Sequence, residues 1–388
     1  MTRKLTCLTF ALILLSANSF AEEIDEIVVL EKKLSSLSGW SNNQSISAIN
    51  QEELEKLDAQ HPKQIFRRSS GVWISRGSGQ EHLTAIRSPV LTGPGACGSF
   101  LVLEDGIPIR PSGFCNVNGL FETFYEMSSG VEIITGPASS RYGANAMHGV
   151  INILSKPIES DNRFYLNAGP NNYKNFKIRA SNKLDWSFDG FFANNDGFRD
   201  QSGYDQQKIR LQSKFDLNEW TGYLKATLTN LNQETAGYVS GLNSYKNEEF
   251  SKQNFNPDAY RDANSQRVSL KLIKEIDDVI SSITPYVRSN DMKFFQHFLP
   301  GTPLEENSHY SFGAIFQRIT DYESFSFIRG LHIDFAKAEL TETQANKLTT
   351  SSAFNNATRP QGKHYDYEVD SITYASVSYT HLRAHETR

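Results

Sequence analysis

Two patterns of hydrophobic and polar positions divide the chain. Before about residue 158, short apolar runs rich in β-branched residues are separated by Gly, Pro and polar turns. From about residue 162 onward, apolar and polar positions alternate with a period of two, as in residues 208–217, 222–230, 268–272 and 331–335. This alternation predicts strands with one apolar and one polar face, and we count roughly ten of about 9–14 residues.

Short turns and long polar loops alternate between these strands, and the longest loops are expected at about residues 231–264 and 340–364. Two architectures fit the alternation: a soluble sandwich, and an outer-membrane barrel whose polar face lines a wet lumen. The strands are long for a sandwich, in which about 5–6 residues are usual. The polar face also carries Lys208, Arg210 and Lys214 in a row. The pattern therefore favours an antiparallel transmembrane β-barrel.

The earlier region predicts a compact domain of helices and short strands, so the expected fold class is an α+β domain followed by the barrel. Ser47 is expected to cap a helix over residues 51–57, and a second helix begins near Lys63. Strands are expected at residues 72–75, 84–87, 100–103, 131–134 and 150–153. Between two apolar runs, Asp105-Gly106 predicts a tight hairpin turn.

The first 21 residues resemble a secretory signal peptide. Arg3 and Lys4 precede a mostly apolar stretch, and Ser19 and Ala21 provide small residues for cleavage. The mature chain is then expected to start at Glu22. No later segment approaches 18 consecutive apolar residues, so no transmembrane helix is predicted.

Charge and motifs exclude several classes of function. The chain has 39 Lys and Arg against 44 Asp and Glu, a net charge of −5, which disfavours a nucleic-acid partner. Residues 75–79 are expected to form a turn rather than a phosphate-binding loop, because they lack the required Lys and spacing. With no catalytic motif found, the sequence predicts no enzyme activity, no cofactor and no resident metal site. His297 and His309, near the loop at residues 298–307, could contact haem or a metal chelate, or be ordinary loop residues.

Two cysteines follow the signal peptide. In an exported protein Cys97 and Cys115 predict a disulfide. The bond would close a loop of about 18 residues, worth roughly 3 kcal/mol in the chain-entropy model. The alternative is a pair of metal ligands, although two sulfurs without nearby His fall short of a zinc site.

Several segments resemble a known family. Residues 131–156, VEIITGPASSRYGANAMHGVINILSK, resemble the closing segment of the plug domain of TonB-dependent outer-membrane receptors. The segments GVWISRGSG, TAIRSPV and FLVLEDGIPI resemble other plug segments, and DEIVVL resembles the TonB box. The resemblance covers about residues 22–158 and extends to the barrel only by pattern. The loop from residue 93 to Cys115 departs from it, because many family members lack a disulfide there.

The resemblance implies a partner for the start of the mature chain. It assigns the TonB box to Asp25, Glu26, Ile27, Val28, Val29 and Leu30. An unpaired β-prone segment can be bound by strand addition, and the implied partner is the TonB energising complex of the inner membrane. The polar residues that follow, up to 43, are expected to be a flexible tether. The alternative is that this segment is the first plug strand or a tail.

The resemblance also implies a set of plug-motif residues: Arg76, Gly77, Arg87, Asp105, Gly106, Gly136, Pro137, Arg141, Tyr142, Gly143, Gly149 and Asn152. The glycines and Pro137 are expected to allow sharp turns. Arg76, Arg87 and Arg141 are expected either to pair with carboxylates of the barrel wall or to remain solvated.

The expected organisation is a signal peptide (1–21), TonB box and tether (22–43), plug (44–158), first part of the barrel (159–379) and a non-native tail (380–388). A plugged barrel of this class has about 22 strands, so about ten indicate a fragment. The tail loses the alternation and packs charges together.

The implied function is TonB-dependent import, across the outer membrane, of a scarce small-molecule nutrient chelate. A ferric siderophore is the first expectation, with cobalamin, haem or a glycan as rivals. The implied partners are TonB, outer-membrane lipid and the chelate. The competing hypotheses are an exported β-sandwich adhesin or binding module, and an exported enzyme.

Overall fold

The computed structural model describes residues 45–90, 98–115, 117–143, 145–159, 161–182 and 185–382. The predicted signal peptide, TonB box, tether and most of the predicted tail therefore lie outside the described residues, as does Cys97. We call residues 45–159 the plug and strands β8–β17 the wall. None of the helices in the described ranges is long and apolar enough to cross a membrane.

The plug is built on a five-stranded sheet in the order β1-β6-β7-β4-β5, in which only β4 and β7 run parallel. A second sheet pairs β2 with β3. The plug elements are β1 (Ser45–Asn50), α2 (Gln51–Leu57), α3 (Pro62–Phe66), β2 (Val72–Ile74), β3 (Thr84–Ile86), β4 (Leu101–Glu104), β5 (Ile107–Pro108), η2 (Gly119–Glu122), η3 (Tyr125–Met127), β6 (Ser128–Thr135), α4 (Ser139–Tyr142) and β7 (Gly149–Ser155).

The plug core lies between this sheet and the two helices α2 and α3. Val131 and Ile133 of β6, with Ile151 of β7, pack against Ile65 and Phe66 of α3, and all five are buried. Burying each such side chain contributes roughly 1.5–3 kcal/mol. The short β-branched runs of the sequence thus form the centre of the plug.

The start of the plug differs from the prediction. Residues 45–50 form strand β1, which pairs with β6, and Ser47 does not cap a helix. Asn50 caps α2 instead: its side chain accepts from the backbone N–H of Glu53 at 3.0 Å, and the Glu53 side chain accepts from the N–H of Asn50. This capping box satisfies two donors at the helix start. Ser47 and Asn50 are both residue types that cap helices well. Only the pairing of residues 45–50 with β6 shows that the helix starts after Asn50 and not after Ser47.

The hairpin turn between β4 and β5 forms as predicted. Asp105 and Gly106 both have positive φ, 52° and 80°. A two-residue hairpin turn of type I′ requires positive φ at both central positions, which Asp and Gly tolerate. The N–H of Gly106 donates to the side-chain oxygen of Asn152 on β7, 2.9 Å away, which fixes the turn to the sheet.

Gly149 is expected to be intolerant of even a methyl group. A Cβ at this position would lie 2.4 Å from the carbonyl oxygen of Ile134 and 2.6 Å from Cγ2 of Ile86. Since one of these atoms is backbone, β6 and β7 would have to separate. We expect Gly149→Ala to lower stability by about 1–3 kcal/mol, measured by thermal unfolding of the detergent-solubilised protein. Gly330→Ala is the control, because its Cβ would meet no atom closer than 3.6 Å. Equal melting temperatures for the two variants would contradict the argument.

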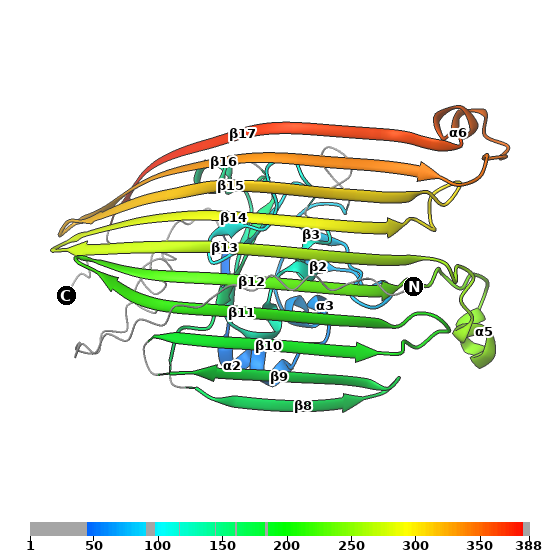
Figure 1. The fold of residues 1–388 in the computed structure, drawn as a ribbon, viewed down its shortest axis with the longest axis horizontal. Helices are drawn as coiled ribbons and strands as arrows, with labels where there is room; N and C mark the ends of the chain where they lie inside the picture. Colours follow the sequence, from blue (N-terminus) through cyan, green and yellow to red (C-terminus); the bar gives the residue numbers. More distant parts are fainter. Residues whose placement is uncertain are drawn as a thin grey trace, which may run out of the picture. The chain divides into compact units, whose positions relative to one another are not determined.

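The wall is a ten-stranded antiparallel sheet in sequence order, with β8 and β17 as its edges among the described residues. Figure 1 shows these strands side by side, with plug elements behind them. The strands are β8 (Arg163–Gly169), β9 (Tyr173–Ser181), β10 (Trp186–Asn195), β11 (Tyr204–Leu217), β12 (Trp220–Glu234), β13 (Tyr260–Ile276), β14 (Val279–Phe295), β15 (Leu304–Asp321), β16 (Phe325–Gln344) and β17 (Gly362–Leu382).

The predicted number of strands is confirmed, but their lengths are not. They range from 7 to 21 residues, and β12 to β17 all exceed the predicted upper length. The two longest loops are correspondingly shorter than predicted, at residues 235–259 and 345–361. They carry η4 (Ser244–Lys246), α5 (Glu248–Lys252) and α6 (Ala353–Thr358). Near the loops both faces of a strand are polar, so alternation no longer marks where the strand ends.

The two faces of the wall match the predicted alternation. Leu211, Leu224, Phe312 and other large apolar side chains of the strands are exposed on the face away from the plug. Between them along the strands, Lys208 and Arg210 are fully buried against the plug. The polar face is thus the inner face, as expected for a barrel filled by a plug.

Candidate functional site: the charged contact between plug and wall

Cations on the wall meet carboxylates on the plug. Every residue of this contact comes from a wall strand or from a turn, a short helix or a strand end of the plug. The plug–wall ion pairs are Arg163–Glu55, Lys177–Asp58, Lys208–Glu126, Arg210–Glu104, Lys225–Asp105, Arg261–Glu81 and Arg267–Glu104. In each pair the wall is positive and the plug negative.

Arg210 of β11 is the centre of the contact. Its Nε and Nη2 both donate to Oδ2 of Asp189 on β10, at 3.0 and 2.9 Å. Toward the plug, Nη2 also donates to the carbonyl of Met127 at 2.7 Å and Nη1 to the hydroxyl of Ser155 at 3.0 Å. Its guanidinium also lies 4.9 Å from the ring centroid of Phe124. A buried arginine with its donors occupied in this way fixes the plug in one position.

Glu104, at the end of β4, receives a second wall arginine. Nη2 of Arg267 lies 2.6 Å from Oε2 of Glu104 and also donates to the carbonyl of Glu122 at 3.0 Å. Arg210 lies 3.9 Å from the other carboxylate oxygen. One plug carboxylate is therefore shared by β11 and β13.

Lys208 holds the segment that contains η3. Its ammonium lies 2.8 and 3.0 Å from the two carboxylate oxygens of Glu126 and donates to the carbonyl of Thr123 at 2.6 Å. It also lies 4.6 Å from the ring centroid of Tyr125. All three donors of the ammonium thus have oxygen partners within reach, which a buried lysine needs.

The hairpin turn of the plug is held by β12. Lys225 forms an ion pair with Asp105 and donates to the hydroxyl of Ser155 at 3.0 Å. Asp105 also accepts from the backbone N–H and the hydroxyl of Ser155, at 2.8 and 2.6 Å. Burial alone would raise the pKa of Asp105, but the Lys225 charge and these hydrogen bonds outweigh it and lower the pKa to about 2. The carboxylate therefore stays ionised throughout the physiological pH range.

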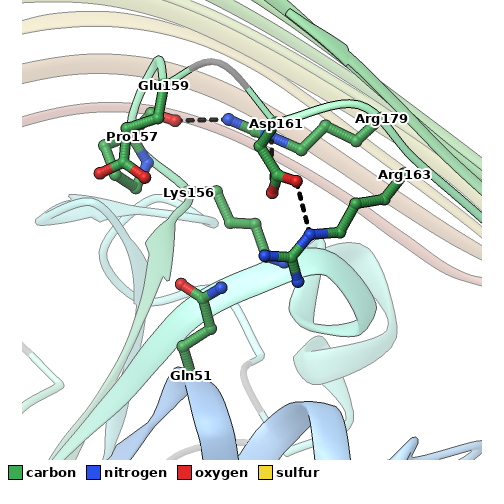
Figure 2. Close-up of a pocket in the computed structure, with 7 residues that line it drawn as sticks. All are labelled: Gln51, Lys156, Pro157, Glu159, Asp161, Arg163 and Arg179. Carbon is green, nitrogen blue, oxygen red and sulfur yellow. Dashed lines mark hydrogen bonds and ion pairs between the residues drawn. The ribbon is translucent and has the colours of Figure 1, made fainter.

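Helix α2 is tied to the junction where the plug continues into the wall. Glu55 accepts from Lys156 at 2.9 Å and from Arg163 at 2.8 Å, and Asp58 lies 2.5 Å from the Lys177 ammonium. Figure 2 shows Asp161 at the same junction, with dashed lines to nearby arginines. Here a cavity of about 150 Å³ is lined by Gln51, Lys156, Pro157, Glu159, Asp161, Arg163 and Arg179.

The predicted arginine partners are not the ones observed. Arg76 and Arg87 are exposed, and neither makes an ion pair with a carboxylate of the described wall, so solvation describes them better. The side chain of Arg141 lies outside the described part. The plug–wall pairs exist with the opposite polarity to the one expected. The charges of Lys208 and Arg210 signalled a polar inner face, but sequence alone could not say which plug residues they meet.

The other predicted plug residues occupy turns and strands of the sheet. Gly136 and Gly143 have positive φ of 122° and 77°, as the predicted turns require, with Pro137 and Tyr142 beside them. Gly77 lies in the loop after β2, and its N–H donates to the carbonyl of Glu81 at 2.8 Å. On β7, Asn152 bridges the hairpin turn and Glu132.

The cysteine and histidine predictions have separate outcomes. Cys115 is disulfide-bonded, whereas Cys97 lies outside the described residues, so the predicted pairing stays a prediction.

His309 is a buried residue of β15 rather than a loop residue, and its ring lies 5.2 Å from that of Phe114. His297 follows β14 and contacts Phe298. The described residues contain no group of three or more His, Cys, Asp or Glu arranged to hold a metal.

Comparison with known protein families identifies the plug. Residues 40–150 match the family model of the TonB-dependent receptor plug domain. The chain is 25% identical over 236 residues to the vitamin B12 transporter BtuB of Vibrio vulnificus. That match covers 56% of this chain and 38% of the relative, so the chain spans about two fifths of the relative's length.

Solved structures share the combination of plug and wall. The unliganded ferric citrate transporter FecA matches with a TM-score of 0.63 at 15% identity, covering 87% of this chain and 58% of that one. The ferric yersiniabactin uptake receptor FyuA of Yersinia pestis matches with a TM-score of 0.58 at 16% identity, covering 78% and 50%. The copper transporter OprC matches at 0.60 and 12%, covering 88% and 53%. At these identities the likeness establishes the fold.

Proposed function

Since this chain carries the plug domain and barrel strands of a TonB-dependent outer-membrane receptor, we propose that it imports a metal-containing nutrient chelate by energised transport. The observation that supports this proposal is the buried charged contact between plug and wall. Seven ion pairs join the two among the described residues, and Arg210 and Lys208 are fully buried within them. Thermal motion would rarely break all of them, so passage of a solute needs an external source of work.

The work would be delivered at the start of the mature chain. We propose that Asp25–Leu30 is added as a strand to TonB, because backbone hydrogen bonds provide affinity without demanding particular side chains. The plug then moves relative to the wall, and the chelate crosses. This scheme gives no residue a chemical role, so what we propose is transport without catalysis.

Two substrate classes have support. The vitamin B12 transporter that matches this chain favours a cobalamin. FecA and FyuA are named for ferric citrate and ferric yersiniabactin, which favours a ferric chelate. We propose a ferric siderophore as the first substrate to test and cobalamin as the second.

Deletion of Ile27–Leu30 in the full-length gene is expected to abolish uptake of radiolabelled chelate while surface binding stays intact. The reason is that energy coupling is lost but the outer binding surface is unchanged. Deletion of Ser35–Ser38 in the tether is the matched control, because it removes four residues and leaves the box whole. Uptake that persists after the first deletion would remove the proposal.

A further inference from the structure

The inner face of the wall has two parts that contact the plug differently. On β9, β11, β12 and β13, long cationic side chains form ion pairs with the plug: Lys177, Lys208, Arg210, Lys225, Arg261 and Arg267. We call this part the clamping face. On β14 and β15 the corresponding positions carry Asn290, Asn307 and His309, which we call the polar seam. None of these three is charged like the clamping residues, and none donates a hydrogen bond to the plug.

The strand register places the two parts side by side in one row. Lys208 is paired with Thr229, Thr229 with Ser265, Ser265 with Asn290, and Asn290 with His309. The row therefore crosses from an ion-paired lysine on β11 to neutral polar side chains on β14 and β15. On β16 it continues to Ala338, the register partner of His309.

Side chains of the polar seam are buried with polar atoms that have no partner. Asn290 is 1% exposed, and neither its amide oxygen nor its amide nitrogen has a hydrogen bond. His309 is 3% exposed, and neither ring nitrogen has one. The amide oxygen of Asn307 is likewise unpartnered. Buried polar groups are normally satisfied, so a cluster of exceptions needs an explanation.

The neighbours of the seam supply no hydrogen-bond partner for its unpartnered atoms. On β16, Ala336 and Ala338 are small inner-face residues. On the plug side, the ring of Phe114 faces His309 and the guanidinium of Arg110 is committed to Glu122 within the plug. The nearby Arg288 of β14 is paired with Asp334 on the wall and also donates to the carbonyl of Pro108 in the plug. The three seam residues themselves therefore meet the plug through ring packing, whereas ion pairs hold it to the clamping face.

We propose that the polar seam is the side of the wall along which the solute passes, and that Asn290, Asn307 and His309 bind an oxygen-rich polar solute during passage. An amide and a neutral imidazole each provide a donor and an acceptor, which suits hydroxyl, amide and carboxylate oxygens. The inference rests on the proposed transport function. It adds the side of the wall along which the solute passes and the class of solute.

Two buried alanines provide a matched test of which side of the wall the solute passes. Ala338 lies beside the seam and Ala193 of β10 lies on the β9–β11 side, 7% and 6% exposed. Each would be changed to cysteine, A338C or A193C, in the full-length receptor. Cells importing the chelate would be treated with a membrane-impermeant, negatively charged maleimide, and labelling would be measured by mass spectrometry. We expect labelling of A338C to rise roughly tenfold or more over cells without a proton gradient, because labelling follows the population of the open state. A193C is expected not to respond.

A second pair of variants tests the binding role. The double variant Asn290→Leu with His309→Phe keeps the seam filled but removes its hydrogen-bonding atoms. We expect its uptake rate to fall roughly tenfold with surface binding and abundance unchanged, which corresponds to about 1.4 kcal/mol of lost stabilisation during passage. Thr284→Val is the control, because Thr284 is buried on the inner face of the same strand but lies away from the seam.

The outcomes separate the two proposals. TonB-dependent uptake with equal labelling at both cysteines, or with stronger labelling of A193C, would overturn the seam and leave the transport function standing. Normal uptake by the double variant would overturn the binding role of the seam residues and leave the transport function standing. A full-length receptor that shows no TonB-dependent uptake of any chelate would remove both.

Discussion

Replacing Arg210 with methionine is expected to weaken the attachment of the plug to the wall. Arg210 and Asp189 are both fully buried, and the substitution leaves the Asp189 carboxylate with Arg179 as its remaining partner at 2.6 Å. It also removes the donors that Met127 and Ser155 of the plug receive from the wall. Breaking one side of a buried ion pair costs about 3–5 kcal/mol.

The expected result has two readouts. The melting temperature of the solubilised receptor should fall, and cells carrying Arg210→Met should become sensitive to large antibiotics that the outer membrane normally excludes. Arg68→Met is the control, because Arg68 is an exposed arginine of the plug. If Arg210→Met matched Arg68→Met in both readouts, the contact at Arg210 would not be what seats the plug.

Lowering the pH from 7 to 4 is expected to destabilise the plug through a buried pair of histidines. The rings of His61 and His82 lie 6.0 Å apart, and both residues are buried. Burial lowers the pKa of His61 to about 4 and that of His82 to about 3. The neighbouring positive charges, including that of each histidine when protonated, act in the same direction.

Hydrogen bonds fix the neutral form of both rings. His61 accepts from the N–H of Lys63 at Nδ1, so its other nitrogen is the one that donates to the Glu81 carbonyl at 3.1 Å. His82 donates from Nδ1 to the Gln80 carbonyl at 2.9 Å, which leaves Nε2 to accept from the N–H of Leu120. A proton added to either ring would have to displace a backbone donor.

The sign follows from the two states of the protein. In the unfolded chain each histidine binds a proton near pH 6.5, whereas in the folded plug it does so only near pH 3–4. The stabilisation is therefore complete above pH 6.5 and decreases as the pH falls toward the folded values. For His82 the loss on reaching pH 4 is about 3.5 kcal/mol, at about 1.4 kcal/mol for each pH unit below 6.5.

Urea titrations at several pH values would measure this loss. Tryptophan fluorescence reports on the N-terminal part in a background where Trp186 and Trp220 of the wall are changed to phenylalanine. His82→Gln should be less stable than the parent at pH 7.5 but should lose less stability on acidification. His61→Gln tests the other ring in the same way. Parallel pH profiles for parent and both variants would show that other groups control acid stability.

The sequence predicts those parts of the fold that depend on the pattern of neighbouring residues. The period of two predicted roughly ten wall strands, and the described sheet has ten, because lipid on one side and a polar lumen on the other impose the alternation. Asp105-Gly106 identified a turn because few residue pairs tolerate two positive φ angles. Where both faces of a strand are polar, as at Gln344 of β16, the alternation disappears and the sequence does not show where the strand ends.

The contact between plug and wall could not be read in the same way. Glu104 and Arg267 are separated by 163 positions, and nothing local to either one specifies the other. The choice of Arg76 and Arg87 as wall partners failed for this reason: the sequence supplies charges of both signs, and only the register of β11 to β13 decides which ones meet. Strand β1 was missed because its partner, β6, lies more than 80 residues later.

The one-sided polarity of the contact has a consequence for the barrel taken without its plug. Lys177, Arg179, Lys208, Arg210, Lys225, Arg261, Arg267 and Arg288 of the described strands would then line the lumen, with Asp189 and Asp334 as buried acids among them. Pores lined by Lys and Arg select for anions. The part of the wall that the structure describes would therefore favour chloride over potassium in a planar bilayer, and the plug supplies the counter-charge of this face.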